Sequence, residues 1–363
     1  MSIWNLIVPF AVCSVLCGAL IFLNQRLGIG RDKSTGVQKF HVNATSRLGG
    51  VALFMGLIFT VGWANSNGSI SSTTHNFLNL FILSSIPVFL AGILEDITHK
   101  IAPASRLMLA LISSTLAYLL LEVKVTRTDV WVVDWLLQWP IFIYLFTLLV
   151  ISGFTHATNI IDGFNGLASG QILLMLGSLS YLNYTTHQLD LFFLSTSLFF
   201  ITIGFFVWNW PFGKIFLGDG GAYFLGFCVV FLGLLLVYRS AQVSPFAPIM
   251  LGIYPLVEVI FSMYRRLVIR GHSVTRADAL HLHSLIFRRV LKNRTSSFNP
   301  QLMNSKVALF FWVVTFIISC ITIIYYKESN VLFGLFFIFI FFYIWLFTQL
   351  VRFKTPRWIF YCL

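Results

Sequence analysis

The sequence contains very little charge for its length. Only 10% of its 363 residues are aspartate, glutamate, lysine or arginine, whereas 58% are hydrophobic and the mean hydropathy is +0.87. A soluble domain normally carries about 25% charged residues, because polar side chains must cover its surface. The shortage of charge therefore excludes a soluble globular domain and predicts an integral membrane protein.

Cysteine is scarce, and a cleavable leader is not expected. The five cysteines lie in or beside apolar runs without metal-ligand spacing, so neither a disulfide framework nor a zinc site is expected. The first apolar run lacks both a positively charged segment before it and a small-residue cleavage pattern. We interpret it as a retained membrane span rather than a secretory signal.

Long apolar runs are abundant. About eleven runs of roughly 17–21 residues are each long enough for a helix to cross a hydrocarbon core of about 30 Å. We expect an all-α, polytopic integral membrane protein that forms a single transmembrane domain over 1–363. The expected spans lie near 3–23, 48–64, 77–94, 105–121, 139–157, 168–184, 190–208, 222–238, 245–262, 307–327 and 331–351.

Positive charge is divided unequally between the predicted loops. With the N-terminus outside, 20 of the 24 lysines and arginines fall on one side, and only Lys124, Arg127, Arg239 and Lys327 fall on the other. The positive-inside rule therefore puts the N-terminus out and the C-terminus in. The net charge of +12 reflects this topology, and no nucleic-acid partner is expected.

The two longest polar segments, 24–47 and 263–306, both fall on the cytoplasmic side. The second is a large basic loop, in which we expect a short amphipathic helix around 278–292. No internal repeat is evident, which weakens a secondary-transporter interpretation.

Four clusters of polar residues stand at the cytoplasmic ends of these spans. Carboxylates at membrane depth cost about 2.5–3.5 kcal/mol each, which makes them functional candidates. The first cluster is Glu95 and Asp96, which can bind Mg²⁺ or position a phosphate, although a solvated helix end explains this pair better when it is taken alone. In the second, Asn159, Asp162 and Asn165 recur every three residues, which predicts one side of a broken helix or re-entrant turn beside a polar cavity.

The third and fourth clusters add a glycine-framed carboxylate and two histidines. Asn209 precedes Gly218-Asp219-Gly220-Gly221, where the glycines let backbone approach a phosphate and Asp219 offers oxygen to a hard cation. His281 and His283, with Arg288 nearby, can hold a diphosphate, but alone they indicate equally a stray zinc site or no site. Together the clusters favour phosphoryl-type transfer from a soluble nucleotide to a lipid, with Mg²⁺ or Mn²⁺ held by carboxylates and phosphates.

These motifs resemble those of the polyprenyl-phosphate N-acetylhexosamine-1-phosphate transferases, glycosyltransferase family 4, which includes the phospho-N-acetylmuramoyl-pentapeptide translocase. The resemblance starts at Thr45 and extends over nearly the whole chain. The family's motifs DDxxD, NxxxDGxDGL, Asn…Pro…GDxG and HxHH are similar, in that order, to Glu95–His99, Asn159–Leu167, Asn209–Gly221 and His281–Ser284.

Four positions depart from the family pattern. Glu95 and His99 replace the first and third aspartates of the acidic motif, Asn165 stands where aspartate is usual, and Ser284 where a further histidine is usual. The other motif aspartates and both outer histidines remain. The departures therefore resemble those of a branch acting on another amino sugar rather than an inactive relative.

The resemblance implies transfer of a sugar-1-phosphate from a UDP-amino sugar to undecaprenyl phosphate, with release of UMP. This would be the first membrane step of a cell-envelope polysaccharide, namely O-antigen (lipopolysaccharide), capsule or wall polymer, at the bacterial inner membrane with the active site facing the cytoplasm. It implies Mg²⁺ or Mn²⁺ as cofactor, and lipid-facing helices leave a homodimer open.

The resemblance also assigns roles to residues. Its implied catalytic residues are Glu95, Asp96, Asp162 and Asp219, with Asp219 as the metal ligand. Its implied substrate-binding residues are Asn159, Asn165, Asn209, His281, His283 and Arg288. We expect the acidic pair to position the lipid phosphate rather than to act as an obligatory base, because a phosphate monoester has a second pKa of about 6 and is mostly dianionic at neutral pH.

The same residues argue against two alternative functions. A CDP-alcohol phosphatidyltransferase would continue Asp162-Gly163 into a DGxxAR pattern, but Ala168 is followed by Ser169. A transporter or channel for an anionic solute would place charges in mid-span and pair broken helices, whereas the charges here lie at span ends.

Overall fold

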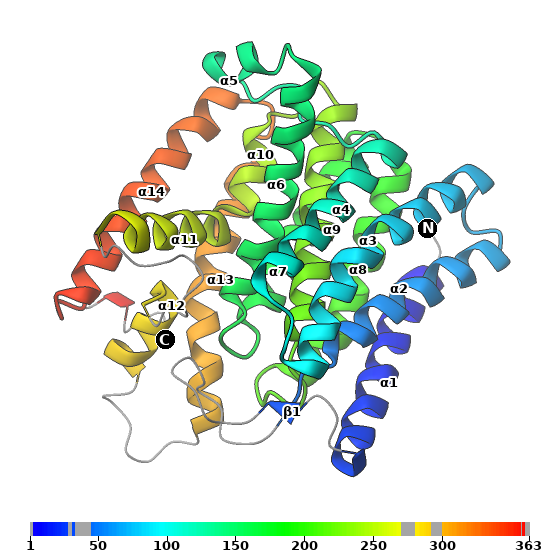
Figure 1. Ribbon diagram of the computed structural model, residues 1–363, viewed down its shortest axis with the longest axis horizontal. Coiled ribbons are helices and arrows are strands. Elements are labelled where there is room, and N and C mark those ends of the chain that lie inside the picture. The colour runs from blue at the N-terminus through cyan, green and yellow to red at the C-terminus, as the bar shows by residue number, and fades with distance from the viewer. Residues whose placement is uncertain are drawn as a thin grey trace.

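The structure is a computed structural model that describes residues 3–27, 31–32, 45–269, 280–291, 300–356 and 358–359. In these ranges most residues are helical (Figure 1). The helices are α1 (Trp4–Leu27), α2 (Gly49–Ser66), α3 (Ser72–Thr98), α4 (Pro103–Leu121), α5 (Trp131–Leu136), α6 (Pro140–Ile161), α7 (Leu167–Thr185), α8 (Leu189–Asn209), α9 (Gly218–Arg239), α10 (Phe246–Leu251), α11 (Ile253–Tyr264), α12 (Leu282–Ile286), α13 (Pro300–Ile324) and α14 (Ser329–Val351). Two π-helical turns, η1 (Arg265–Ile269) and η2 (Phe287–Leu291), continue α11 and α12, and the short strands β1 (Arg31–Asp32) and β2 (Thr45–Ser46) pair antiparallel.

The predicted polytopic all-α membrane fold is confirmed. Within the described ranges, nine helices are long and apolar enough to cross a membrane: α1 to α4, α6, α8, α9, α13 and α14. The helix α7 has 19 residues, but buried polar side chains such as Gln171 and Asn183 make it less apolar than the nine spans. The predicted spans 168–184 and 245–262 are the two that do not reach this standard.

The prediction of one uninterrupted span over 245–262 is wrong. This run forms two helices, α10 and α11, which meet at Gly252, and neither is long enough to cross a bilayer. Pro255 has no backbone N–H to donate to Leu251, so the helical hydrogen bonds cannot continue through the junction. Figure 1 shows α11 lying across the direction of α6 and α13.

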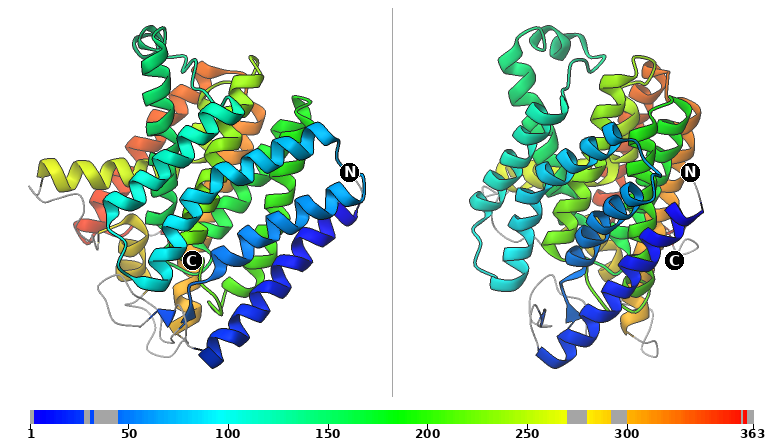
Figure 2. Two further views of the ribbon diagram at one scale, coloured as in Figure 1. Left: turned by 45° about the vertical axis from the view of Figure 1, so that its right-hand side comes forward. Right: turned by 90° about the vertical axis from the view of Figure 1, so that its right-hand side faces the viewer.

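The helix α9 is the centre of the bundle. It packs against α2, α3, α6 and α7, and its side chains are buried along nearly its whole length. Helix α1 lies at the periphery, where most of its surface is not covered by protein (Figure 2). An apolar helix that is buried on all sides needs neighbours on every face, and α2, α3, α6 and α7 supply most of them.

The first turn of α9 is packed between α2 and α3 through glycine. A Cβ atom on Gly92 of α3 would collide with the backbone of Asp219 and Gly220, and one on Gly50 of α2 would collide with the backbone of Gly221. Small residues allow helix backbones in a membrane to approach this closely. The start of α9 is therefore fixed between two other helices.

The polar connections are described only in part. The predicted amphipathic helix around 278–292 is found as α12 and η2, within residues 280–291. The rest of the predicted basic loop 263–306 includes 270–279 and 292–299, which lie outside the described residues, as does 33–44 of the predicted polar segment 24–47.

We expect Gly92→Ala to destabilise the protein by about 1–3 kcal/mol, because the added methyl group overpacks the contact with α9. Thermal unfolding of the purified protein in detergent measures this. Gly62→Ala is the matched control, since a Cβ atom there has no neighbour within 4 Å. Equal melting temperatures for the two variants would contradict the close packing.

Candidate active site

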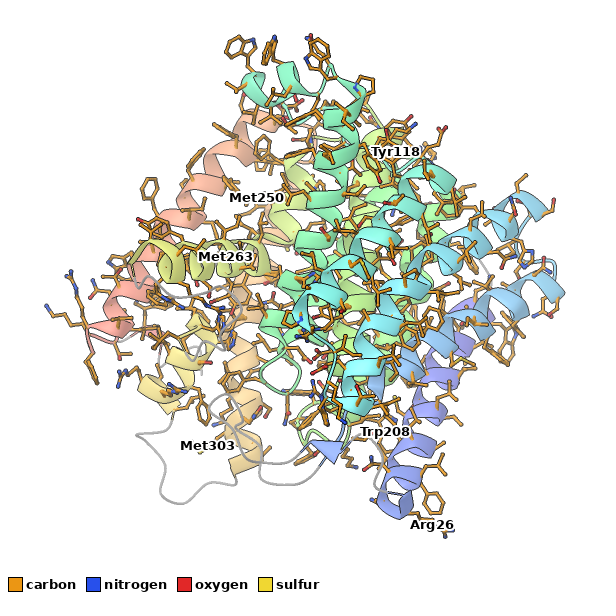
Figure 3. All side chains as sticks on the ribbon, viewed as in Figure 1. Arg26, Tyr118, Trp208, Met250, Met263 and Met303 are labelled. Carbon is orange, nitrogen blue, oxygen red and sulfur yellow. The ribbon has the colours of Figure 1, made fainter. Side chains whose placement is uncertain are left out.

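The four predicted clusters lie at one end of the helix bundle. Helices α3, α6 and α8 end there, and α4, α7 and α9 begin there, so the three connections between them meet. Figure 3 labels Trp208 and Met303 near this end and Tyr118 toward the opposite end. The prediction that the clusters share one end of the molecule is confirmed.

Asp96 joins the first cluster to the third. Its carboxylate is fully buried and accepts hydrogen bonds from the backbone N–H groups of Asp219, at 2.9 Å, and Gly220, at 2.8 Å. These N–H groups open α9, and a carboxylate is stabilised at a helix N-terminus by the helix dipole. In this arrangement Asp96 caps α9, and its predicted catalytic role stays a prediction.

Asp219 is held by two arginines. Arg47 lies 2.8 Å from one carboxylate oxygen and Arg106 lies 2.8 Å from the other, and the Nε atom of Arg47 also lies 3.1 Å from Asp96. Buried carboxylates require such counter-ions, because burial without them is costly. Sequence reasoning had used both arginines only to assign topology. Arg47 lies within the segment that starts the family resemblance, whereas no motif marks Arg106.

Asp162 lies beside this group without a counter-ion of its own. It follows the last residue of α6, and its side chain makes no hydrogen bond or ion pair with any described residue. Burial raises the pKa of Asp162 to about 7; the guanidinium of Arg47 opposes this shift and Asp219 adds to it. A cation placed here would stabilise the charged form.

No protein cage for a metal ion is present within the described ranges, since no three histidine, cysteine, aspartate or glutamate residues converge there as ligands. Asp162 and Asp219 remain as two nearby carboxylates. This donor set fits Mg²⁺, which proteins often bind through one or two carboxylates together with substrate phosphates.

Two of the predicted substrate-binding amides connect the loops. The side chain of Asn209 accepts from Gly166 N–H at 2.8 Å and donates to the Ile215 carbonyl at 2.8 Å. The side chain of Asn165 donates to the Pro211 carbonyl at 3.3 Å, and its backbone N–H donates to Asn304. Both amides hold the loops after α6 and α8 together, and their contact with a substrate stays a prediction.

The remaining polar residues border the carboxylates. Asn159 lies beside Tyr223 of α9, whose ring centroid is 5.1 Å from that of His156. Glu95 accepts from Ile101 N–H at 2.8 Å, which fixes the turn between α3 and α4. Tyr223 and His156 are therefore further residues of this site that sequence reasoning did not select.

The two histidines are held by α11. His281 Nδ1 lies 3.0 Å from the carboxylate of Glu258, and His283 Nδ1 lies 2.9 Å from the Tyr254 hydroxyl. Glu258 is fully buried, and sequence reasoning missed it. The available signal was that Glu258 is the single charged residue of the run 245–262.

The histidines also meet the second cluster. The ring of His283 lies against Gly163 and contacts Phe164, with ring centroids 5.6 Å apart. Burial lowers the pKa of His283 to about 3, so this side chain offers a hydrogen bond but no charge at neutral pH. Arg288 lies half-buried on η2, and its predicted contact with a diphosphate stays a prediction.

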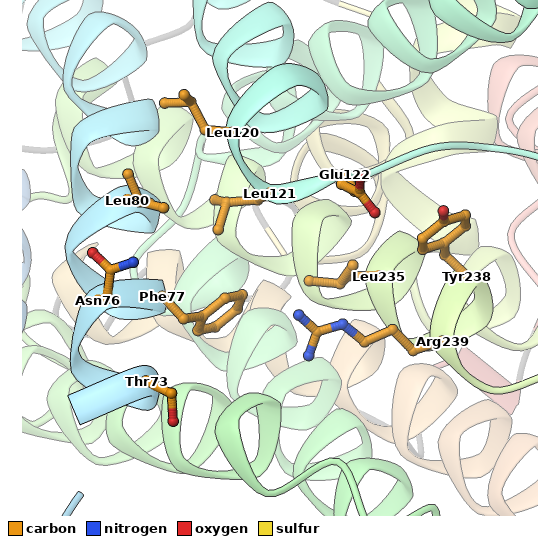
Figure 4. Close-up of a pocket in the computed structure, with 10 residues that line it drawn as sticks. All are labelled: Thr73, Asn76, Phe77, Leu80, Leu120, Leu121, Glu122, Leu235, Tyr238 and Arg239. Carbon is orange, nitrogen blue, oxygen red and sulfur yellow. The ribbon is translucent and has the colours of Figure 1, made fainter. Parts of the chain in front are cut away.

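A pocket of about 280 Å³ lies at the opposite end of the bundle, between α3, α4 and α9 (Figure 4). Its lining includes Phe77, Leu121, Glu122 and Arg239, and Arg239 pairs with Asp190 at 2.6 Å. None of the predicted site residues lines it. The candidate active site is therefore the polar end of the bundle rather than this pocket.

We expect Asp96→Asn to lower stability by about 3–5 kcal/mol, because an amide removes one of the two charge partners of Arg47 and places an NH₂ group against backbone N–H donors. Unfolding in detergent measures the loss. Glu122→Gln is the control, since its side chain is 69% exposed and should cost less than about 0.5 kcal/mol. If Asp96→Asn is as stable as Glu122→Gln, the fold does not need Asp96 to cap α9.

Comparisons with known proteins agree with the motifs. Residues 78–237 match the profile of "Glycosyl transferase family 4". A "Probable undecaprenyl-phosphate N-acetylglucosaminyl 1-phosphate transferase" of Bacillus subtilis is 27% identical over 86% of this chain and 82% of its own length. An "Undecaprenyl-phosphate alpha-N-acetylglucosaminyl 1-phosphate transferase" of Thermotoga maritima is 28% identical over 80% of this chain and 83% of its own length.

A "Phospho-N-acetylmuramoyl-pentapeptide-transferase" of Streptococcus pneumoniae is 26% identical over 87% of this chain and 96% of its own length. The profile match covers Glu95, Asp96, Asp162 and Asp219. The fold, the order of the motifs and these matches agree with one another. Over residues 78–237 the chain is similar to glycosyl transferase family 4.

Proposed function

We propose that this chain transfers an N-acetylhexosamine-type sugar-1-phosphate from a UDP-sugar to undecaprenyl phosphate. The products are polyprenyl-diphosphate-sugar and UMP. The observation that carries the proposal is the meeting of Asp162 and Asp219 with Arg47 and Arg106 at one end of a membrane bundle. The names of the relatives support the same two substrates.

The site is proposed to face the cytoplasm of a bacterial inner membrane. Of the 24 lysines and arginines, 20 fall on the predicted side of the four clusters, which supports this orientation through the positive-inside rule. Nucleotide sugars would then reach the site from the cytoplasm, and the lipid phosphate from the bilayer.

The reaction brings two anions together. An oxygen of the lipid phosphate attacks the phosphorus that carries the sugar, and the bond from that phosphorus to the oxygen of the UMP group breaks. Arg47 and Arg106 supply positive charge at this end of the bundle. Mg²⁺ held by Asp162 and Asp219 would neutralise further phosphate charge and orient the phosphates.

The other residues position these groups. Asp96 fixes the start of α9 and hence Asp219, and the neutral His283 offers its Nε2 atom as a hydrogen-bond partner. Glu258 fixes the orientation of His281 through Nδ1. Since the lipid phosphate is mostly dianionic at neutral pH, no side chain has to remove a proton from it.

The decisive experiment uses the purified protein with undecaprenyl phosphate, Mg²⁺ and a panel of UDP-amino sugars, and measures UMP. We expect UMP release with at least one sugar and its loss on chelation of the metal. If none of the UDP-amino sugars gives UMP, the proposal is wrong. Uptake of an anionic solute by vesicles without UMP release would favour the transporter alternative.

We expect Glu258→Gln to lower kcat/KM about 10–100-fold, because the buried carboxylate orients His281 much as a carboxylate orients a histidine ligand. UMP release at varied UDP-sugar concentration measures it. Glu258→Asp should recover part of the activity. If a lower melting temperature alone explains the loss of activity in Glu258→Gln, Glu258 supports the fold and does not position His281.

A further inference from the structure

Both oxygens of the Asp219 carboxylate are engaged by arginines. One oxygen is bound by Arg47 and the other by Arg106, each at 2.8 Å. Charge-assisted hydrogen bonds of this length are strong, and a guanidinium and a cation compete for the same oxygen. A metal ion that binds Asp219 therefore competes with these arginines for the carboxylate.

The surrounding charges favour such an exchange. Glu95, Asp96, Asp162 and Asp219 supply four carboxylates, against the two guanidinium groups of the arginines. With all four carboxylates ionised, this group is two positive charges short of neutrality, which equals the charge of one divalent cation. Asp162 has no ion-pair partner among the described residues, so the missing positive charge is missing beside this carboxylate.

The two arginines are anchored differently. Arg47 bridges two carboxylates, because its Nε atom lies 3.1 Å from Asp96 while another nitrogen binds Asp219. Arg106 binds Asp219 through one nitrogen, and its buried Nε atom has no hydrogen-bond partner among the described residues. A buried donor without a protein partner is unusual, and Arg106 therefore has fewer contacts to hold it than Arg47. Arg106 is the arginine that can move.

We propose that Arg106 is an exchangeable counter-ion. It neutralises Asp219 before the metal binds, and it transfers to the diphosphate of the nucleotide sugar when the metal takes the carboxylate. Arg47 stays anchored on Asp96 during the exchange. This inference rests on the proposed function, since it uses the UDP-sugar as the anion that receives Arg106.

The exchange makes metal and nucleotide binding mutually dependent. A nucleotide that draws Arg106 away frees an oxygen of Asp219 for the metal, and a metal on Asp219 frees Arg106 for the nucleotide. Coupling free energies are reciprocal, so each ligand must raise the affinity for the other by the same factor. A permanent Arg106–Asp219 pair would give no such coupling through this residue.

The test measures Mn²⁺ binding to the purified, metal-free protein by electron paramagnetic resonance, with and without UDP-N-acetylglucosamine. In the unmodified protein we expect the nucleotide sugar to tighten Mn²⁺ binding by about 5–150-fold, the usual range of such coupling. In Arg106→Gln we expect tighter Mn²⁺ binding in the absence of nucleotide and a smaller coupling factor than in the unmodified protein, since only the direct contact between the metal and the phosphates then couples the two ligands. Asp219→Asn should weaken Mn²⁺ binding in both conditions.

Arg239→Gln is the matched control, because it removes an arginine from another carboxylate, Asp190, at the far end of the bundle. It should bind Mn²⁺ as the unmodified protein does. Arg106→Lys provides a second variant that keeps the charge, and it should retain part of the coupling. Unchanged or weaker Mn²⁺ binding in a folded Arg106→Gln protein would overturn the inference.

The measurement separates this inference from the proposed function. Mn²⁺ binding without nucleotide tests the contact between Arg106 and Asp219 and needs no chemical step. If UMP is released but Arg106→Gln leaves Mn²⁺ affinity unchanged, the function stands and the exchange is overturned. If Arg106→Gln tightens Mn²⁺ binding but no UDP-sugar binds or reacts, the counter-ion role at Asp219 is supported and the proposed function fails.

Discussion

The carboxylate of Asp96, buried at the start of α9, is the interaction on which the site depends. It accepts two backbone N–H groups of α9 and lies beside Arg47, so its charge is compensated within the protein. The glycines at 50 and 92 allow α2 and α3 to reach the same turn. Because Asp219 is part of this turn, its carboxylate is fixed relative to three helices before any substrate arrives.

Much of the fold follows from composition and spacing. Apolar runs and the shortage of charge predicted the spans, and the predicted topology placed the clusters at one end. The break between α10 and α11 was missed, because the run 245–262 is apolar throughout apart from Glu258. Hydropathy measures how apolar a run is, and it does not register that a proline interrupts the helical hydrogen bonds.

The sequence predicts which residues belong to the site better than it predicts what each residue does there. Arg47 and Arg106 contact Asp219 across 172 and 113 residues of sequence, and no local pattern encodes such pairs. Sequence likewise cannot separate Asp162, whose carboxylate has no partner in the described part of the chain, from Asp96, whose carboxylate is fully used. All these residues look alike as polar groups near a span end, and only their neighbours distinguish them.

Because α11 lies across the bundle, two different parts of the structure hold the two halves of the site. The carboxylates stand on α9, which is enclosed by other helices, whereas the histidines depend on Glu258 and Tyr254 of a short helix outside that enclosure. An inhibitor that contacts only the carboxylate half meets a surface that is already formed. One that reaches His281 and His283 also depends on where α11 lies, so its affinity reports the position of that helix.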